Sequence, residues 1–321
     1  MPVSAPAPGP GKTARRPLDA TALAHVQRRL QSAAEPPWLH SEVARRMAER
    51  LGVVKLQPGC ALDWGAFLGA SRSVLAAAYP RAQLIAVEPD AARRDATAAA
   101  LAPPWWSARR WRGGVPQARS AQLAQLAQEV PAGAAQLVWS NMGLHGDLDP
   151  QQTMLQWHRA LAIDGFLMFS TLGPGTLTTL SALYADAGWP PPLAPLVDMH
   201  DLGDMLIEAG FADPVMDQET VTLTWATPAA LLAELRQLGG NVDPRRTAGL
   251  RTPRWREQLH GRLQRLAVGP MPTARLALPF EIVYGHAFKP APRPRLAART
   301  ELPLDDLRAM VRQPRRTLPQ G

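Results

Sequence analysis

Residues 60–88 read CALDWGAFLGASRSVLAAAYPRAQLIAVE, and this stretch decides the fold. CALDWG (60–65) is a short apolar run that ends in an acid and a glycine, which predicts a buried strand followed by a tight turn. SRSVLAAAY (71–79) predicts a helix, and AQLIAVEP (82–89) predicts a second buried strand that also ends in an acid. A strand, a glycine-containing loop, a helix and a second strand make one unit of an α/β sheet.

The loop and the second acid predict binding of a nucleoside. Gly65 and Gly69 would let the backbone approach a ligand closely. Glu88 follows about 20 residues later, where its carboxylate can accept hydrogen bonds from both hydroxyls of a ribose. Because no GK[ST] sequence lies nearby, a phosphate-binding P-loop is not indicated.

The rest of the chain continues this alternation. Helices are predicted over 18–34 and 38–51, and the second has an apolar stripe at Leu39, Val43, Met47 and Leu51. Further strands are predicted at 134–141, 164–172, 213–226 and 276–288, and further helices at 91–101, 150–161, 200–211, 227–240 and 252–266. The last two helices begin with Thr-Pro, an N-cap followed by proline at the first helical position. The pattern predicts a parallel, doubly wound sheet.

Motifs spread over residues 36–288 resemble one enzyme family. The loop 63–69 (DWGAFLG) resembles the D/E-x-G-x-G-x-G loop of class I S-adenosylmethionine-dependent methyltransferases, with Phe67 at the middle glycine. WSN (139–141), RAL (159–161), DGFLMFSTLGPGTL (164–177), HDLGDMLIEAGF (200–211) and FEIVYGHAF (280–288) are similar to the malonyl-acyl-carrier-protein O-methyltransferases of biotin synthesis. They are also similar to a related arginine hydroxylase that assists assembly of mitochondrial complex I.

This resemblance implies a Rossmann-like α/β fold of the class I methyltransferase type, with a helical lid at about 227–268. It implies S-adenosylmethionine as cofactor, held by Asp63, Gly65, Gly69, Glu88 and Asn141. His145, shortly after the fourth-strand motif, is a candidate contact for the substrate. No catalytic residue and no metal site are predicted.

The implied reaction is transfer of a methyl group to the free carboxylate of a malonyl thioester on an acyl carrier protein or coenzyme A. A carboxylate is already anionic at neutral pH, so desolvation and alignment are expected to suffice without a general base. The lid contains eight arginines and three acids, and such a basic surface would attract an acidic carrier protein. A solvated helix face is the plainer interpretation of the same charges.

Two departures from the family pattern leave alternatives open. Phe67 stands where the backbone usually passes close to the cofactor, and residues 105–128 contain no acid that could bind the adenine amino group. A noncatalytic binding protein on the same fold is therefore one alternative, and an arginine hydroxylase or assembly factor is another.

Charge and composition limit the domain boundaries, the classes of partner and the location that we expect. The net charge of +8 comes from the ends, since residues 18–288 contain 24 basic and 24 acidic residues. We therefore expect disordered basic tails at 1–17 and 289–321 around a methyltransferase domain at 18–288, with no nucleic-acid partner. The N-terminus lacks a secretory signal and no apolar stretch is long enough to span a membrane, so a cytoplasmic protein without a membrane partner is expected. The sequence does not predict the oligomeric state.

Overall fold

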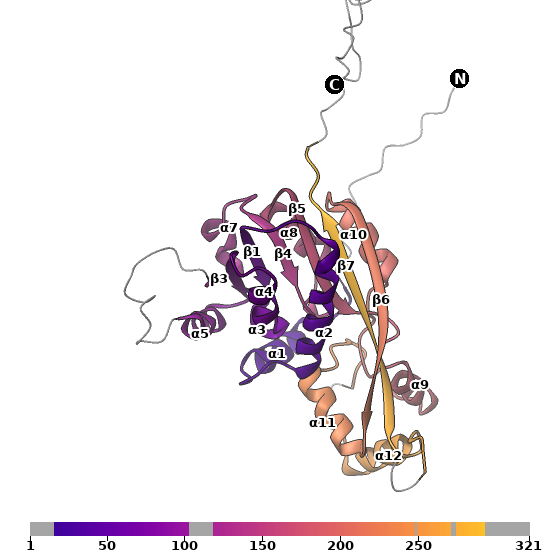
Figure 1. Ribbon diagram of the computed structural model, residues 1–321. Helices are drawn as coiled ribbons and strands as arrows, with labels where there is room; N and C mark the ends of the chain where they lie inside the picture. The colour runs from indigo at the N-terminus through magenta and orange to yellow at the C-terminus, as the bar shows by residue number, and fades with distance from the viewer. Residues whose placement is uncertain (1–15, 103–117, 248, 271–273, 293–321) are drawn as a thin grey trace, which may run out of the picture. The chain divides into compact units, whose positions relative to one another are not determined.

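The computed structural model describes residues 16–102, 118–247, 249–270 and 274–292 (Figure 1). Its centre is a seven-stranded sheet in the order β3-β2-β1-β4-β5-β7-β6. The strands are β1 (Cys60–Trp64), β2 (Gln83–Glu88), β3 (Ala118–Gln122), β4 (Ala135–Ser140), β5 (Leu161–Leu172), β6 (Ala212–Trp225) and β7 (Leu276–Phe288). This is the Rossmann-like sheet of class I methyltransferases, as the sequence predicts.

One expectation about the sheet is wrong: the sheet is mixed and not wholly parallel. Strands β1 to β5 run parallel, but β7 lies between β5 and β6 and pairs antiparallel with both. Strand alternation along the chain cannot show this, because the direction of a strand depends on where the preceding connection re-enters the sheet. Strand β3 and the helix α9 (Thr178–Asp186) were also not predicted.

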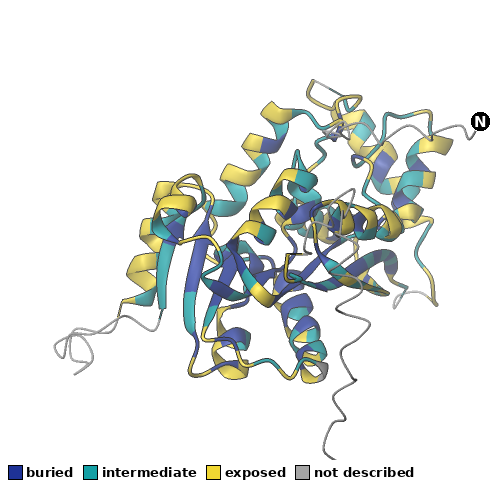
Figure 2. Ribbon diagram, turned by 90° about the horizontal axis from the view of Figure 1, so that it is seen from above, coloured by how far each residue is buried: buried dark blue, intermediate teal, exposed yellow. Residues whose placement is uncertain are grey.

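Helices cover both faces of the sheet, and the alternation of side chains along each strand divides the core in two. Ala61, Leu137 and Trp139 belong to the cluster that includes α2 (Trp38–Glu49) and α4 (Arg72–Ala78). Their neighbours Leu62 and Val138 belong to the cluster that includes α8 (Pro150–Ala160) and α10 (Met199–Glu208). Figure 2 shows the result, with buried strands between helices whose outer faces are exposed. The predicted stripe on α2 is confirmed, since Leu39, Val43, Met47 and Leu51 are all buried.

Further helical elements occur along the described chain. They are α1 (Ala20–Gln31), η1 (Arg50–Val53), α3 (Ala66–Gly69), α5 (Ala91–Leu101), η2 (Leu123–Gln125), α7 (Leu126–Glu129), η3 (Leu144–Gly146), α11 (Pro228–Leu238) and α12 (Pro253–Gln264). The Thr-Pro caps are confirmed, because Thr227 accepts a hydrogen bond from Ala230 N–H and Thr252 accepts one from Trp255 N–H. Helices α11 and α12 lie between β6 and β7 in the chain. They are found near the end of β6 and the start of β7 (Figure 1).

The predicted boundary of the N-terminal tail needs a correction. Arg16, assigned above to the tail, is only 8% exposed, and its backbone N–H donates to Leu148 O at 3.0 Å. Leu148 lies more than a hundred residues further along the chain, so nothing local to Arg16 could indicate this contact. The remainder of the predicted N-terminal tail, up to residue 15, and the predicted C-terminal tail from residue 293 lie outside the described residues, as do residues 103–117.

Candidate active site

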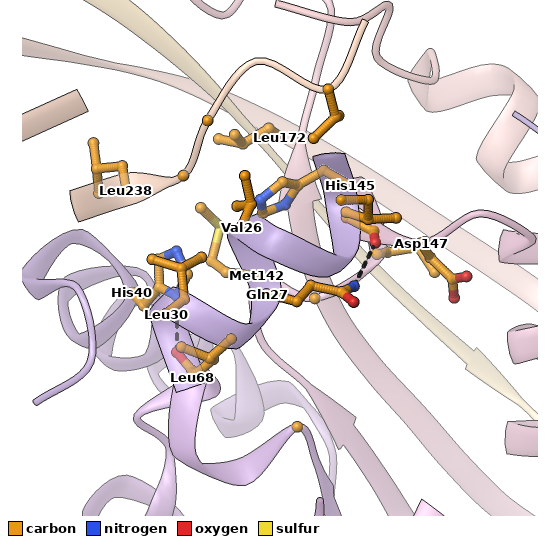
Figure 3. Close-up of a pocket in the computed structure, with 18 of the residues that line it drawn as sticks. Val26, Gln27, Leu30, His40, Leu68, Met142, His145, Asp147, Leu172 and Leu238 are labelled. Atoms are coloured by element: carbon orange, nitrogen blue, oxygen red, sulfur yellow. Dashed lines mark hydrogen bonds between the residues drawn. The ribbon is translucent and has the colours of Figure 1, made fainter. Parts of the chain in front are cut away.

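A cavity of about 720 Å³ lies at the carboxyl ends of β1, β2 and β4. In a parallel α/β sheet this edge is where ligands bind, because loops and helix N-termini converge there. Helix α1 lines the cavity with Val26, Gln27 and Leu30, and Figure 3 shows these side chains gathered with His40 and His145. The walls are mostly aliphatic, with a few polar groups at separate points.

The loop after β1 has the glycines where the backbone needs them. Gly65 has a φ of 70°, in the left-handed region, and a Cβ added there would meet nothing within 4 Å. Gly69 is needed for a different reason, because a Cβ there would lie 3.3 Å from Ser71 Oγ and 3.5 Å from Asn141 O. Gly65 therefore opens the cavity, whereas Gly69 allows the loop to pack against the end of β4.

Phe67 does not fill the cavity. Its ring lies under the guanidinium of Arg93, with Arg93 Cζ 3.7 Å from the ring centroid, and Phe67 is absent from the described residues that line the cavity. Its backbone N–H instead donates to Glu88 Oε1 at 3.0 Å. The residue that replaces the family's middle glycine thus faces away from the ligand space and helps to fix the carboxylate at the end of β2.

Glu88 presents one carboxylate oxygen that has no partner. Oε1 accepts hydrogen bonds from Phe67 N–H and from the Thr97 hydroxyl at 2.8 Å, whereas Oε2 is buried without a partner among the described residues. Burial raises the pKa of Glu88 to about 6. Glu88 lines the cavity, and a buried carboxylate oxygen without a partner is suited to accept hydrogen bonds from ligand hydroxyls that reach it.

Asp63 lies behind the cavity and does not line it. Burial, with a smaller effect from the charge of Glu88, raises the pKa of Asp63 to about 8, and its Oδ1 has no partner in the described parts of the chain. Asp63 is the last residue but one of β1.

Asn141 holds three elements together at the end of β4. Its amide nitrogen donates to Gly69 O at 2.6 Å and to His40 O at 2.7 Å, and its amide oxygen accepts from Ser170 Oγ at 2.6 Å. These contacts join the glycine loop, α2 and β5 at one point on the cavity wall. Both amide hydrogens are used, so Asn141 shapes the site through the backbone that it binds.

Two neutral histidines share the cavity. His40 Nδ1 lies 2.7 Å from Leu68 O, and because a carbonyl only accepts, Nδ1 is the protonated nitrogen and Nε2 is left as an acceptor. The rings of His40 and His145 are 6.4 Å apart, edge to face. Burial lowers the pKa of His40 to about 4 and that of His145 to about 3, so neither carries a charge at neutral pH.

The structure brings Gly65, Glu88, Asn141 and His145 to one cavity and places Asp63 and Gly69 behind it. Sequence reasoning missed His40 and Arg16, which also line the cavity. Neither belongs to a recognisable motif: His40 lies on a helix whose pattern indicates only core packing, and Arg16 lies in a segment rich in proline and arginine.

Comparison with known proteins gives relatives along most of the chain. The malonyl-[acyl-carrier protein] O-methyltransferase of Gallionella capsiferriformans is 37% identical over 260 residues, covering 79% of this chain and 85% of that protein. The protein of the same name from Laribacter hongkongensis is 36% identical over 262 residues, covering 80% and 84%. Among solved structures, the YcgJ protein of Bacillus subtilis aligns with a TM-score of 0.49 at 10% identity, over 78% of this chain and 99% of that one. No family model matches the chain.

Proposed function

The chain belongs to the malonyl-[acyl-carrier protein] O-methyltransferases, and we propose that it methylates the free carboxylate of a malonyl group carried as a thioester on an acyl carrier protein. The observation that carries the proposal is the buried, unpartnered Oε2 of Glu88 on the wall of a cavity that opens beside the glycine turn. As in the family it resembles, we assign the reaction to biotin synthesis. We further propose that it takes place in the cytoplasm, without a nucleic-acid or membrane partner; no helix in the described parts of the chain is long and apolar enough to span a bilayer.

The cavity residues fit S-adenosylmethionine, which is the cofactor. Oε2 of Glu88, which has no partner, would accept hydrogen bonds from the ribose hydroxyls. The open space beside Gly65 would admit the nucleoside. Asp63 and Gly69 would support this loop from behind, and Asn141 would fix it against β4. When bound, the cofactor supplies an electrophilic methyl group on a sulfonium sulfur.

The chain's own contribution to the reaction is enclosure and alignment. Leucines and valines from α1, from the loops after β4 and β5 and from α11 contribute apolar wall to the cavity, so an acceptor carboxylate bound there loses much of its water. A carboxylate is ionised at neutral pH and needs no base. Because burial lowers the pKa of His40 to about 4 and that of His145 to about 3, both imidazoles are weak bases, which agrees with a site that orients its substrate and removes no proton from it.

The helical lid supports an acidic protein as carrier. Around α12, Arg251, Arg254, Arg256 and Arg265 are exposed and form no ion pair with any described residue, and Glu257 is the one acid among residues 251–265. A surface of this kind attracts an acidic partner at long range and orients it on arrival. His145 remains a proposed contact for the substrate.

The alternatives are not favoured. A noncatalytic protein was suggested by Phe67 and by the absence of an acid in residues 105–128. The Phe67 ring stacks with Arg93 and leaves the cavity open, whereas residues 105–117 lie outside the described residues. The arginine hydroxylase alternative gains no support from the relatives, which are methyltransferases.

The test is transfer of an isotope-labelled methyl group from S-adenosylmethionine to purified malonyl-acyl carrier protein. We expect a labelled ester that is removed by mild base, and no label on acetyl-acyl carrier protein. Calorimetric binding of S-adenosylmethionine without any transfer would reject the reaction but keep the cofactor site. Absence of binding at millimolar cofactor would reject both.

A further inference from the structure

We propose that Arg16 binds the acceptor's carboxylate and so selects a thioester with a free acid group. This inference rests on the proposed function and adds the residue that recognises the malonyl end. Arg16 lines the same cavity as Glu88 and His145, although it enters from the N-terminal segment ahead of α1.

The guanidinium of Arg16 is held in place but not neutralised. Nη1 donates to His145 O at 2.5 Å and lies 3.4 Å from Asp147 O, and Nη2 donates to Pro195 O at 2.6 Å. All three acceptors are backbone carbonyls. A guanidinium has five N–H groups, so two remain for another acceptor. Within the described residues no carboxylate lies in ion-pair distance of Arg16.

Asp147 is the acid whose charge acts on Arg16, and its carboxylate accepts hydrogen bonds from other groups. Oδ1 accepts from Asp149 N–H at 2.9 Å, and Oδ2 accepts from the Thr153 hydroxyl. Figure 3 shows the Asp147 side chain directed away from the His145 ring. The cation is therefore buried, fixed by backbone carbonyls and not in an ion pair with any described carboxylate. Burial lowers the pKa of Arg16, and the charge of Asp147 offsets only part of this effect.

A buried charge is unfavourable unless it is paired, and the two remaining N–H groups favour a planar anion. A carboxylate matches this need, since two of its oxygens can face two N–H groups of one guanidinium. Two of the acids that line the cavity lie at the end of β2, where the nucleoside would bind: Glu88 is the last residue of the strand, and Asp90 follows it. The third acid that lines the cavity, Asp147, lies near Arg16, but its two carboxylate oxygens accept hydrogen bonds from Asp149 and Thr153. The free N–H groups of Arg16 are therefore the cationic donors at the end of the cavity where an acid acceptor would bind.

Contacts connect Arg16 to the proposed donor site. Arg16 binds the backbone of His145, whose ring is the edge-to-face neighbour of His40. His40 in turn is bound to Leu68 in the glycine loop. The other cation on the cavity wall, Arg28, is exposed, so water screens it and it offers a poorer site for a desolvated carboxylate.

The experiment uses the full chain and separates binding from turnover. Malonyl-pantetheine and acetyl-pantetheine, which differ by one carboxylate, are titrated calorimetrically into protein saturated with S-adenosylhomocysteine. Arg16→Met should weaken binding of malonyl-pantetheine by about 10-fold to 100-fold and leave acetyl-pantetheine unchanged. Arg16→Lys should recover part of the loss. Arg81→Met, at an exposed arginine that does not line the cavity, is the matched control with no expected change.

If Arg16→Met weakens the binding of both thioesters equally, or weakens the binding of S-adenosylhomocysteine, Arg16 only supports the structure of the cavity wall. Either result would overturn the proposal. Unchanged binding of malonyl-pantetheine to Arg16→Met would also overturn it. These titrations need no turnover. A wild-type protein that binds malonyl-pantetheine through Arg16 but transfers no methyl group would therefore reject the proposed function and retain this site.

Discussion

Glu88 is an ionisable group whose protonation should be visible in cofactor binding. Burial raises its pKa to about 6, so the protonated form predominates below that pH in the ligand-free protein. Ribose hydroxyls donate hydrogen bonds to the ionised form. We therefore expect the affinity for S-adenosylmethionine to be highest above pH 6 and to fall about tenfold between pH 7.5 and pH 5, measured calorimetrically.

The control for this prediction is Glu88→Gln, which keeps the shape but cannot ionise. It should bind the cofactor more weakly at pH 7.5 and show a flat profile over the same range. A profile that keeps its slope in the variant would assign the titration to another group, such as Asp63.

Phe67 gives a second prediction, because its ring lies outside the cavity. Phe67→Ala should leave the affinity for S-adenosylmethionine within about threefold of wild type. It should lower the free energy of unfolding by about 0.5–1 kcal/mol from loss of the stacking with Arg93. Gly65→Ala is the contrasting variant, since a side chain at a φ of 70° is strained, and it should reduce both stability and affinity. A gain in affinity for Phe67→Ala would mean that the ring obstructs the site.

At the scale of elements, an ion-pair network fixes α2 to the outer strands of the sheet. Glu219 on β6 accepts from Arg46 Nη1 at 2.7 Å and from the Tyr284 hydroxyl at 2.6 Å. Arg50, which follows α2, donates to Asp217 on β6 at 2.8 Å. Since α2 also carries His40, the network holds one wall of the cavity against the sheet.

We expect Glu219→Gln to lower the free energy of unfolding by about 1 kcal/mol, because these side chains are roughly 30% exposed and solvent weakens the interaction. Urea denaturation measures it. Glu49→Gln is the matched control: Glu49 pairs with Arg45 within α2 but is 63% exposed, and its loss should be undetectable. Similar destabilisation by both variants would show that the contact between α2 and β6 has no special role.

At the scale of the described body, the two signs of charge are separated. The proposed helical lid at about 227–268 is basic, whereas residues 198–219 contain seven acids and no lysine or arginine. A protein partner that is itself acidic would be attracted to the lid and repelled from the acidic segment.

Reversing two charges on the lid, Arg254→Glu with Arg256→Glu, should lower kcat/KM for malonyl-acyl carrier protein by about 10-fold to 100-fold at low salt. The loss should shrink as ionic strength rises, because salt screens exposed charges. Malonyl-pantetheine, which has no carrier protein, should react at an unchanged rate. Arg81→Glu, an exposed charge before β2, is the matched control. Equal losses with both substrates would exclude the lid as a docking surface.

The sequence determined the order of the main elements and the nature of the cofactor loop. The apolar runs before Asp63 and Glu88, the glycine at position 65 and the Thr-Pro helix starts each act over a few residues, so their local chemistry is sufficient to place them. The spaced motifs likewise identify the family, because each motif is a local residue pattern within one element.

Tertiary structure decided the direction of β7, the orientation of the Phe67 ring and the membership of Arg16 and His40 in the cavity. Each depends on partners far along the chain: Arg16 meets the carbonyl of His145, and Asn141 joins His40 to Gly69. Periodicity and propensity describe neighbours in sequence and carry no information on such pairs. Only the folded chain, in which α1 and α2 line a cavity at the carboxyl edge of the sheet, brings a cation without an ion pair and an unpartnered carboxylate oxygen to one cavity.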